Sequence, residues 1–450
     1  MIRIYKTVLT TLVISIASII AYAQDTTSQA FSLKQAQDYA LENAFSAKSY
    51  ALGVDQAKTN VNESISYGLP QVNGSVSFQD FLQLPTSLVP AEFFGGTPGE
   101  FAKIKFGTTY NLTAGVSASQ MLFDPTWIIG VQGAKMYLEK MRNMDKKNDQ
   151  DIKATIEQVY YAVLVNERFK NLMEQNLASQ EKLLHEVTEY QKSGFREQSD
   201  VDQISLTVSN YKTSLAETTR QIENNKNALK LLMGYPQEKD IQLTDALESM
   251  WVLNNHEALV NSKFDLKQNI NYYLADMEVT LNGYLLKIEK SKYLPTASAF
   301  INYQQQALSN DFSFFSNGDR WFPMSVWGIN LKIPIWDSFA KAASVKRSKL
   351  NLERIHDQKT FTEQQLTMQF SNARSNYISA FEKMNAEEAN IKLAESIRDK
   401  TIIKFNEGLA SSVELLQIEM QLEGRQMAYI FSLHQMLNAK TELNKSLNNY

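Results

Sequence analysis

Two long stretches of the chain carry a helical pattern of apolar residues and contain no proline. Residues 126–235 and 335–450 lack proline, and a proline inside a helix costs about 3 kcal/mol. We place a helix-ending turn at Gly194 in the first stretch and at Gly408 in the second, because glycine adopts the left-handed conformation cheaply. Four long helices are therefore predicted, over 126–192, 199–233, 338–406 and 412–448.

Apolar residues in these helices recur at alternating spacings of three and four. The seam of the helix 199–233 consists of Val201, Ile204, Val208, Tyr211, Leu215, Ile222 and Leu229. The preceding helix has the same spacing at Ile152, Ile156, Val159 and Val163. Such heptads indicate helices packed side by side as a coiled coil. A helix of about 65 residues extends about 100 Å, so we expect a rod rather than a globule.

Four shorter segments alternate apolar and polar residues with a period of two. In the first of them, Val72, Val76 and Phe78 alternate with polar residues. The segments are 71–82, 108–123, 296–306 and 323–336. One apolar and one polar face over about 10 residues is typical of a strand in a membrane barrel with a wet lumen. A half-exposed strand in a soluble sandwich has the same pattern.

The two halves of the chain repeat one layout. Leu69-Pro70 before the first strand recurs as Leu294-Pro295 before the third, and Leu122-Phe123-Asp124 after the second strand recurs as Ile335-Trp336-Asp337 after the fourth. Both turn glycines are followed by the pattern G-x5-[DE]-[VL]-x-Q-I. Each half therefore reads helix, strand, strand, long helix, turn, helix, which indicates an internal duplication.

This layout sets the expected domain boundaries. The first repeat is placed at 24–234 and the second at 264–450, with a linker or equatorial segment at 235–263 between them. The main difference between the halves is the stretch 83–106, which contains three prolines and is expected to be a long loop.

Residues 1–23 have the composition of a secretory signal peptide. Arg3 and Lys6 precede an apolar run, and Ala21-Tyr22-Ala23 fits a signal-peptidase site. The formal net charge is -4, and about -6 without these residues, which gives no support to nucleic-acid binding. The absence of cysteine excludes a disulfide framework and a thiolate metal site.

No motif of enzyme chemistry is found. The chain has no phosphate loop, no G-x-S-x-G and no glycine-rich dinucleotide turn. His185, His256, His356 and His434 are scattered without metal-ligand spacing, and all but His256 lie in predicted coiled-coil helices, where exposure to solvent is expected. We therefore predict that the chain is not an enzyme and has no cofactor or metal.

Strands of this kind have a consequence for assembly. Four strands cannot close a membrane barrel, and an open edge in lipid leaves backbone groups without hydrogen-bond partners at several kcal/mol each. If the strands cross a membrane, several copies of the chain must share one barrel, extended by a tube of helical hairpins.

In its order of motifs the chain resembles the TolC family of outer-membrane efflux and secretion ducts. The resemblance covers essentially all of the chain after residue 23 and rests on the duplicated layout, the Leu-Pro strand entries, the two strand exits and the two turn patterns. It implies a homotrimer with a 12-stranded barrel, four strands per chain, continued by a long periplasmic coiled-coil barrel. It also implies a location in the outer membrane with a large periplasmic portion, contact with outer-membrane lipid, and docking to a periplasmic adaptor and an inner-membrane pump of the RND or ABC type.

The resemblance also suggests site residues at the two turns. In the family these turns lie at the periplasmic tip, and acidic residues beyond the second glycine help to form a cation-attracting aperture. Glu414 lies at one such position, whereas Gln417 replaces the second acidic residue. The candidate aperture and adaptor-contact residues are Gly194, Asp200, Gly408, Glu414 and Gln417.

Local helix chemistry offers a second interpretation of these positions. Ser411-x-x-Glu414 has the pattern of a helix capping box, as has Ser199-x-x-Asp202 in the first half. The two roles are compatible for Glu414. For the whole chain, the alternative to a channel is a periplasmic coiled-coil structural or adaptor protein without a pore.

Overall fold

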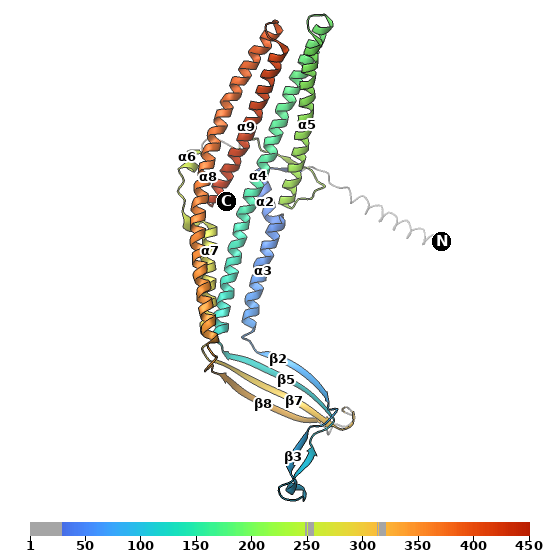
Figure 1. The fold of residues 1–450 in the computed structure, drawn as a ribbon, viewed down its shortest axis with the longest axis vertical. Coiled ribbons are helices and arrows are strands. Elements are labelled where there is room, and N and C mark those ends of the chain that lie inside the picture. Colours follow the sequence, from blue (N-terminus) through green and yellow to red (C-terminus); the bar gives the residue numbers. More distant parts are fainter. Residues whose placement is uncertain (1–28, 248–249, 251–255, 313, 315–320) are drawn as a thin grey trace, which may run out of the picture. The chain divides into compact units, whose positions relative to one another are not determined.

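The computed structural model describes residues 29–247, 250, 256–312, 314 and 321–450 (Figure 1). The signal peptide predicted at 1–23 lies outside the described residues. The chain forms two compact units. The helical unit comprises Asn143–Leu274, Phe361–Tyr450 and the residues up to Leu52, and the sheet unit comprises Gly53–Arg142 and Ala275–Thr360. The units do not follow the predicted repeat boundaries, because the two longest helices, α4 (Pro125–Lys192) and α8 (Ala340–Asn406), each contribute their first part to the sheet unit and their second part to the helical unit.

The four long helices form within two residues of the predicted bounds. They are α4 (Pro125–Lys192), α5 (Gln198–Met233), α8 (Ala340–Asn406) and α9 (Ser412–Ser446). The start predicted for α8 at 338 is wrong, because Ser338 and Phe339 have positive φ angles of 54° and 69° and cannot continue a helix. The α5 seam is confirmed at its buried positions, which are Ile204, Val208, Tyr211, Ile222 and Leu229.

Shorter elements complete the two units. Helix α2 (Leu33–Asn43) begins with a capping box between Ser32 and Gln35, and α3 (Phe45–Ser66) follows it. The short strands β1 (Gln29–Phe31) and β6 (Ile241–Leu243) pair in parallel. Helices α6 (His256–Val260) and α7 (Ile270–Ser291), with the short η4 (Leu266–Gln268) between them, lie in the second half of the chain.

The main core of the helical unit joins α2, α4, α5 and α9. Phe31, Tyr39 and Tyr235 form a triangle of edge-on aromatic contacts with ring centroids 5.6–5.7 Å apart. Gly234 ends α5 with a φ of 71°, and a Cβ atom there would lie 2.3 Å from the carbonyl oxygen of Asn43. This position therefore requires glycine both for its backbone conformation and for its close approach to the end of α2.

The sheet unit holds a four-stranded antiparallel sheet with the order β2-β5-β7-β8. The strands are β2 (Gln71–Asp80), β5 (Tyr110–Phe123), β7 (Thr296–Ser309) and β8 (Trp321–Lys332). The end predicted for the fourth strand, 336, is wrong. Lys332 already lies opposite Thr296, the first residue of β7, and Pro334 has no N–H to donate.

The stretch 83–106 is not the plain loop that was predicted. It forms a second antiparallel pair, β3 (Thr86–Pro90) with β4 (Phe101–Lys105), connected through the short η1 (Ala91–Phe94). Its prolines fit this arrangement because Pro90 ends a strand, where a missing N–H interrupts no ladder beyond it.

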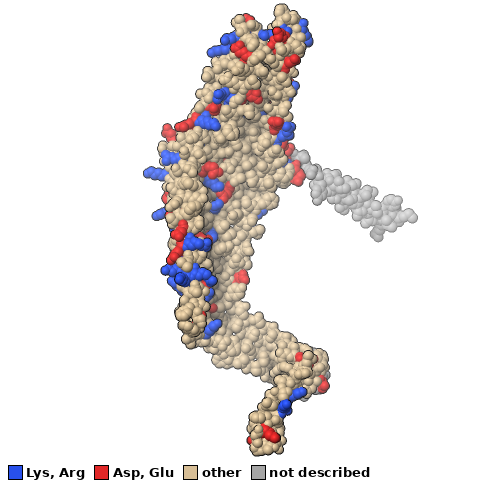
Figure 2. All heavy atoms as spheres, in the orientation of Figure 1, with Lys and Arg blue, Asp and Glu red and all other residues tan. Residues whose placement is uncertain are grey.

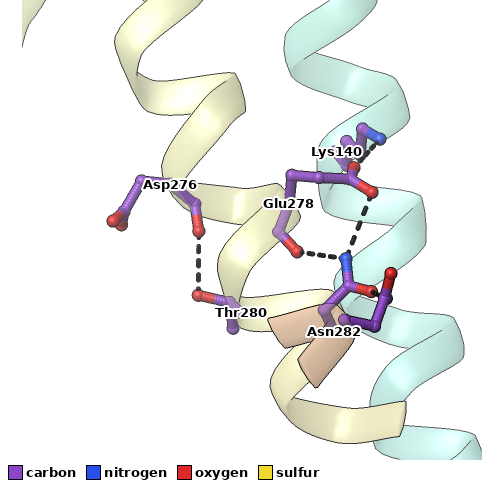
Figure 3. A network of polar contacts seen from close by, with 6 residues as sticks. Lys140, Asp276, Glu278, Thr280 and Asn282 are labelled. Atoms are coloured by element: carbon purple, nitrogen blue, oxygen red, sulfur yellow. Dashed lines mark hydrogen bonds and ion pairs between the residues drawn. The ribbon is translucent and has the colours of Figure 1, made fainter. Parts of the chain in front are cut away.

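A polar network joins three helices within the sheet unit (Figure 3). Lys140 of α4 forms an ion pair with Glu278 of α7. Asn282, one turn further along α7, donates its Nδ2 to the carbonyl oxygen of Glu278 at 2.8 Å and accepts from Asn351 Nδ2 of α8 at 2.7 Å. These contacts fix the register of α7 against its two neighbours.

Among the described helices, none combines the length and the hydropathy needed to span a membrane.

We predict that Gly234→Ala destabilises the chain by roughly 1–3 kcal/mol, the usual cost of a strained backbone position, and that its clash with Asn43 adds to this. Thermal unfolding followed by circular dichroism checks the effect. Gly424→Ala is the matched control, because a Cβ there meets no atom within 4 Å and Gly424 lies inside α9. A control variant that loses as much stability as Gly234→Ala would contradict the argument.

Candidate functional site

The register of the sheet aligns apolar residues across all four strands on one face, and polar residues across β2, β5 and β7 on the other. One row of neighbours across the sheet consists of Val72, Ala118, Ile301 and Trp327. The adjacent row, on the other face, consists of Asn73, Ser117, Asn302 and Val326. Trp327 is 75% exposed, and the apolar face continues along β8 through Ile329 and Leu331, which are also exposed. The predicted alternation is therefore confirmed for β2, β5 and β7 and for the second part of β8, whereas the first part of β8 also carries Phe322, Met324 and Val326 on the opposite face. Most of the apolar face is exposed, and Phe312 and Phe314 pack against Phe78 and Tyr110 at one end of it.

The sheet also has two free edges. Strands β2 and β8 stand at the ends of the order, and neither pairs with a further strand among the described residues. Exposed edges of this length are sites at which another chain can add.

At the ends of α4 and α8, the turn glycines adopt the conformation that the sequence predicts. Gly194 and Gly408 have φ angles of 81° and 73°. The N–H of Gly194 donates to Gln191 at 2.9 Å and the N–H of Phe195 donates to Tyr190 at 2.9 Å. The same pair of bonds follows α8, and together they form the Schellman motif that closes a helix.

The first turns of α5 and α9 are capped differently. Ser411 Oγ accepts from the backbone N–H of Glu414 at 3.1 Å, so the serine half of the capping box predicted for α9 is present. The return bond from the Glu414 side chain is not found among the described residues. The cap predicted at Ser199 and Asp202 is wrong, because α5 begins at Gln198 and its capping box links Glu197 with Asp200. An ionised carboxylate accepts hydrogen bonds as a serine hydroxyl does, which is why Glu197 can take this position.

The candidate aperture residues lie on these two turns. Glu414 and Gln417 are exposed and one turn apart on α9, directly beyond Gly408. Asp200 is half-buried in the first turn of α5 and is held by its cap contact with the N–H of Glu197 at 3.4 Å. Glu414 and Gln417 thus share a solvent-facing surface, whereas Asp200 serves its own helix.

Arg196 connects the two hairpins at their tips and was not singled out in the sequence. Its Nη2 donates to the carbonyl oxygen of Phe405 at 2.6 Å, and its guanidinium lies 4.0 Å from the centre of the Phe405 ring. Phe405 is 2% exposed and belongs to a small tip cluster with Leu183, Val187, Ile204, Ala410 and Leu415. The turn of one hairpin is therefore joined to the last turn of the other.

A polar layer lies between the tip cluster and the main core. Gln180, Glu419 and Gln426 are buried there, and Asn176 Nδ2 donates to Gln426 Oε1 at 2.7 Å. Glu419 and Gln426 occupy the α9 seam between Leu415 and Ile430, so a polar residue at an apolar seam position is the signal that could have revealed this layer.

Glu419 is the buried carboxylate of this layer. Its side chain is 5% exposed, and its Oε1 has no hydrogen-bond partner among the described residues. Burial raises the pKa of Glu419, and this effect outweighs the opposing influence of Arg398 and of a hydrogen bond from Gln180. A carboxylate of this kind destabilises the folded state when it is ionised.

The histidines form no site. Among the described residues, no group of three or more histidine, aspartate or glutamate side chains could hold a metal ion. His185 and His356 are exposed, as expected. His434 is not, since it is half-buried on α9 and burial lowers its pKa. His256 stacks on Phe381 with ring centres 3.7 Å apart, which indicates packing of the segment between the repeats; Trp251 of that segment lies outside the described residues.

Comparisons with known proteins give the fold. No family model matches the chain, and no curated protein does. Solved structures match over nearly its whole length. CusC, a protein that forms a transmembrane channel, is 16% identical, with 92% of this chain and 91% of CusC covered at a TM-score of 0.71.

Two further structures agree. The outer membrane protein VceC of Vibrio cholerae is 15% identical, with coverage of 92% and 95% and a TM-score of 0.69. The CmeC outer membrane channel of Campylobacter jejuni is 15% identical, with coverage of 92% and 85% and a TM-score of 0.70. The chain therefore has the fold of these channels, a long helical domain joined to a β domain, as the resemblance to the TolC family implied.

We predict that Glu419→Gln stabilises the helical unit near pH 7 by roughly 1–3 kcal/mol, the cost of an unsatisfied buried polar group. The raised pKa means that the folded state binds a proton more readily than the unfolded state. The wild type therefore loses stability as the pH rises from the ordinary value of 4.5 through the raised pKa. The advantage of the variant should shrink as the pH falls towards 4.5.

Thermal unfolding at a series of pH values checks this prediction. Glu217→Gln, at an exposed position of α5, is the matched control and should leave the pH profile unchanged. A variant that is less stable than the wild type at pH 7 would show that Glu419 is stabilised by its neighbours.

Proposed function

We propose that this chain is the outer-membrane channel subunit of a tripartite efflux or type I export system. It would act as a passive conduit from the periplasm and an inner-membrane pump to the exterior. The observation that carries the proposal is the sheet, which has an exposed apolar face, an opposite polar face and two free edges. Apolar residues that face lipid and polar residues that face a wet lumen are the pattern of a membrane barrel.

The free edges support a shared barrel. The β2 edge of one copy would pair with the β8 edge of the next, because an edge in lipid cannot stay unpaired. With four strands per chain, three copies would supply a 12-stranded barrel, the homotrimer that the resemblance implies. The long helices of the three copies would then form the periplasmic tube, and the matched element order of the two halves supports their origin by duplication.

The tips of the hairpins are the proposed contact with the rest of the system. The resemblance places a periplasmic adaptor and an RND or ABC pump there, and the turns at Gly194 and Gly408 would provide the surface. Glu414, exposed beyond Gly408, would contribute one charge per copy to an acidic aperture. Asp200 and Gln417 would border it. Solved channels with this fold, such as CmeC, support the channel over the coiled-coil tether without a pore.

Single-channel recording of the full-length protein in a planar bilayer tests the proposal. We expect small, steady conductance steps from a detergent-stable oligomer. If the inserted wild type stays closed, Arg196→Gln should produce conductance, because it removes the contact between the hairpin tips. An inserted oligomer in which neither protein conducts would overturn the channel in favour of the structural alternative.

We predict that Glu414→Gln weakens block of the channel by a trivalent cation roughly tenfold, about 1.4 kcal/mol for the ring of charges. The substitution removes the charge and keeps the cap, because Ser411 accepts from the backbone N–H of residue 414. Titration of the block in the planar bilayer measures the effect. Glu217→Gln serves as the control, and an unchanged block in Glu414→Gln would leave Glu414 with the capping role alone.

A further inference from the structure

Lysine and arginine side chains gather on the parts of α7 and α8 that belong to the sheet unit. Figure 2 shows them along these two helices, towards the end where the strands begin. The group consists of Lys287 and Lys290 on α7, Lys292 directly after it, and Lys346, Arg347 and Lys349 on α8, all exposed, and is called the basic collar below.

Few carboxylates neutralise the basic collar. Lys292 pairs with Glu289 at 2.7 Å, and Lys349 reaches Glu353 only at 4.0 Å. Lys290, Lys346 and Arg347 form no ion pair within the described part of the chain. Exposed pairs of this kind are weak, so the surface remains positively charged.

The two helices present these charges together. Asn351 of α8 donates to Asn282 of α7 at 2.7 Å, and Lys359 of α8 pairs with Asp276 of α7 at 2.7 Å. The helices are therefore neighbours along their length in the sheet unit, and their cations form one continuous surface.

An exposed aromatic and aliphatic segment separates the basic collar from the strands. Ile335 is 91% exposed and Trp336 is 72% exposed, and Phe339 packs edge-on against Trp336 with ring centres 5.0 Å apart. On the α7 side, Tyr293 and Leu294 are exposed as well. At a membrane interface, lipid-facing strands are followed first by aromatic residues and then by lysine and arginine. The same order is found here.

The α8 cations lie slightly further from the start of the helix than the thickness of a headgroup layer, a difference that their long side chains can span. Lys346 and Arg347 lie roughly 9–11 Å along α8 from its first residue, at 1.5 Å per residue. The polar layer on each side of a bilayer is about 5–8 Å thick. Because side chains on a helix lean towards its N-terminus, those of α8 lean back towards the strand ends and into this layer.

We propose that the basic collar binds the headgroups of anionic phospholipids in the leaflet on the side of the helices. This inference rests on the proposed function, because it requires the strands to cross a bilayer. Phosphate groups would pair with Lys290, Lys346 and Arg347, which lack ion-pair partners within the described part of the chain, while the acyl chains would lie beside Trp336 and Ile335. The continuity of the basic collar with this apolar segment favours a lipid over an acidic protein.

Quenching of Trp336 fluorescence by brominated lipids tests the proposal. The full-length protein is reconstituted in vesicles of phosphatidylcholine that contain brominated phosphatidylglycerol or brominated phosphatidylcholine. The Trp336 signal is the difference from Trp336→Phe. We expect phosphatidylglycerol to associate about three- to tenfold more strongly at low salt, with the preference falling towards one at about 1 M salt, where the Debye length is about 3 Å.

The triple variant Lys290→Gln, Lys346→Gln and Arg347→Gln should lose this preference. The matched control Lys392→Gln, Lys400→Gln and Lys404→Gln removes the same charge from the other end of α8 and should keep it. Four outcomes would overturn the lipid site while leaving the channel. The wild type conducts but shows no preference for phosphatidylglycerol, or the preference does not fall at high salt. Alternatively, the preference survives in the triple variant, or the control variant loses it equally. A protein that does not insert into vesicles would overturn both proposals. Loss of adaptor binding in the triple variant, with the lipid preference unchanged, would assign the basic collar to an acidic protein instead.

Discussion

The hydrogen bonding of β5 with β7 is the interaction on which the rest of the structure depends. It pairs a strand of the first half of the chain with a strand of the second, from Tyr110 opposite Ser309 to Phe123 opposite Ala297. Each of these strands also pairs with the other strand of its own half, so one ladder unites two hairpins into a four-stranded sheet. A one-residue slip in this ladder would turn every side chain of one half to the other face. The alignment of apolar rows across all four strands shows that the register is set by the requirement for one apolar face.

The long helices satisfy a different constraint. Their backbone groups are paired within each helix, so their association depends on side chains alone. In the main core apolar residues of α2, α4, α8 and α9 supply this, with Leu229 and Met233 from the end of α5, and Leu415, Phe405 and Ile204 supply it again at the tip. Between the two clusters the seam of α9 changes to Glu419 and Gln426, whose polar groups need specific partners. Such a layer contributes less to stability than leucine and more to the register of the helices. The tip cluster is consequently a separate packing unit, joined across the hairpins by Arg196.

Sequence pattern was sufficient where a local rule determines the structure. The left-handed glycines, the heptad seam of α5, the serine half of the cap at Ser411 and the two faces of β2, β5 and β7 each depend on a few neighbouring residues, and each is found as predicted. The misses depend on residues distant in sequence. The end of β8 at Lys332 is set by where β7 begins, and the partial burial of His434 depends on what packs around α9. Arg196 has the composition of an ordinary surface turn, and only the tertiary fold brings Phe405 beneath it. The three prolines of 83–106 exclude a helix but not a strand pair, because Pro85 and Pro90 lie at the ends of β3 and Pro98 lies before β4.

The acidic residues of the two turns were considered for two roles, capping their own helix and forming an aperture. Their surroundings in the structure separate these roles. Asp200 and Glu414 are equivalent in the repeated pattern, yet their surroundings differ. The carboxylate of Asp200 accepts from the N–H of Glu197, so its charge is used within its own helix. In the second half Ser411 provides the cap, and the carboxylate of Glu414 has no capping bond to make and remains exposed. A serine cap therefore frees an acidic side chain at the tip of the second hairpin, where it is exposed to solvent. This difference between the halves is the physical reason why the proposed acidic aperture is assigned to the second turn rather than the first.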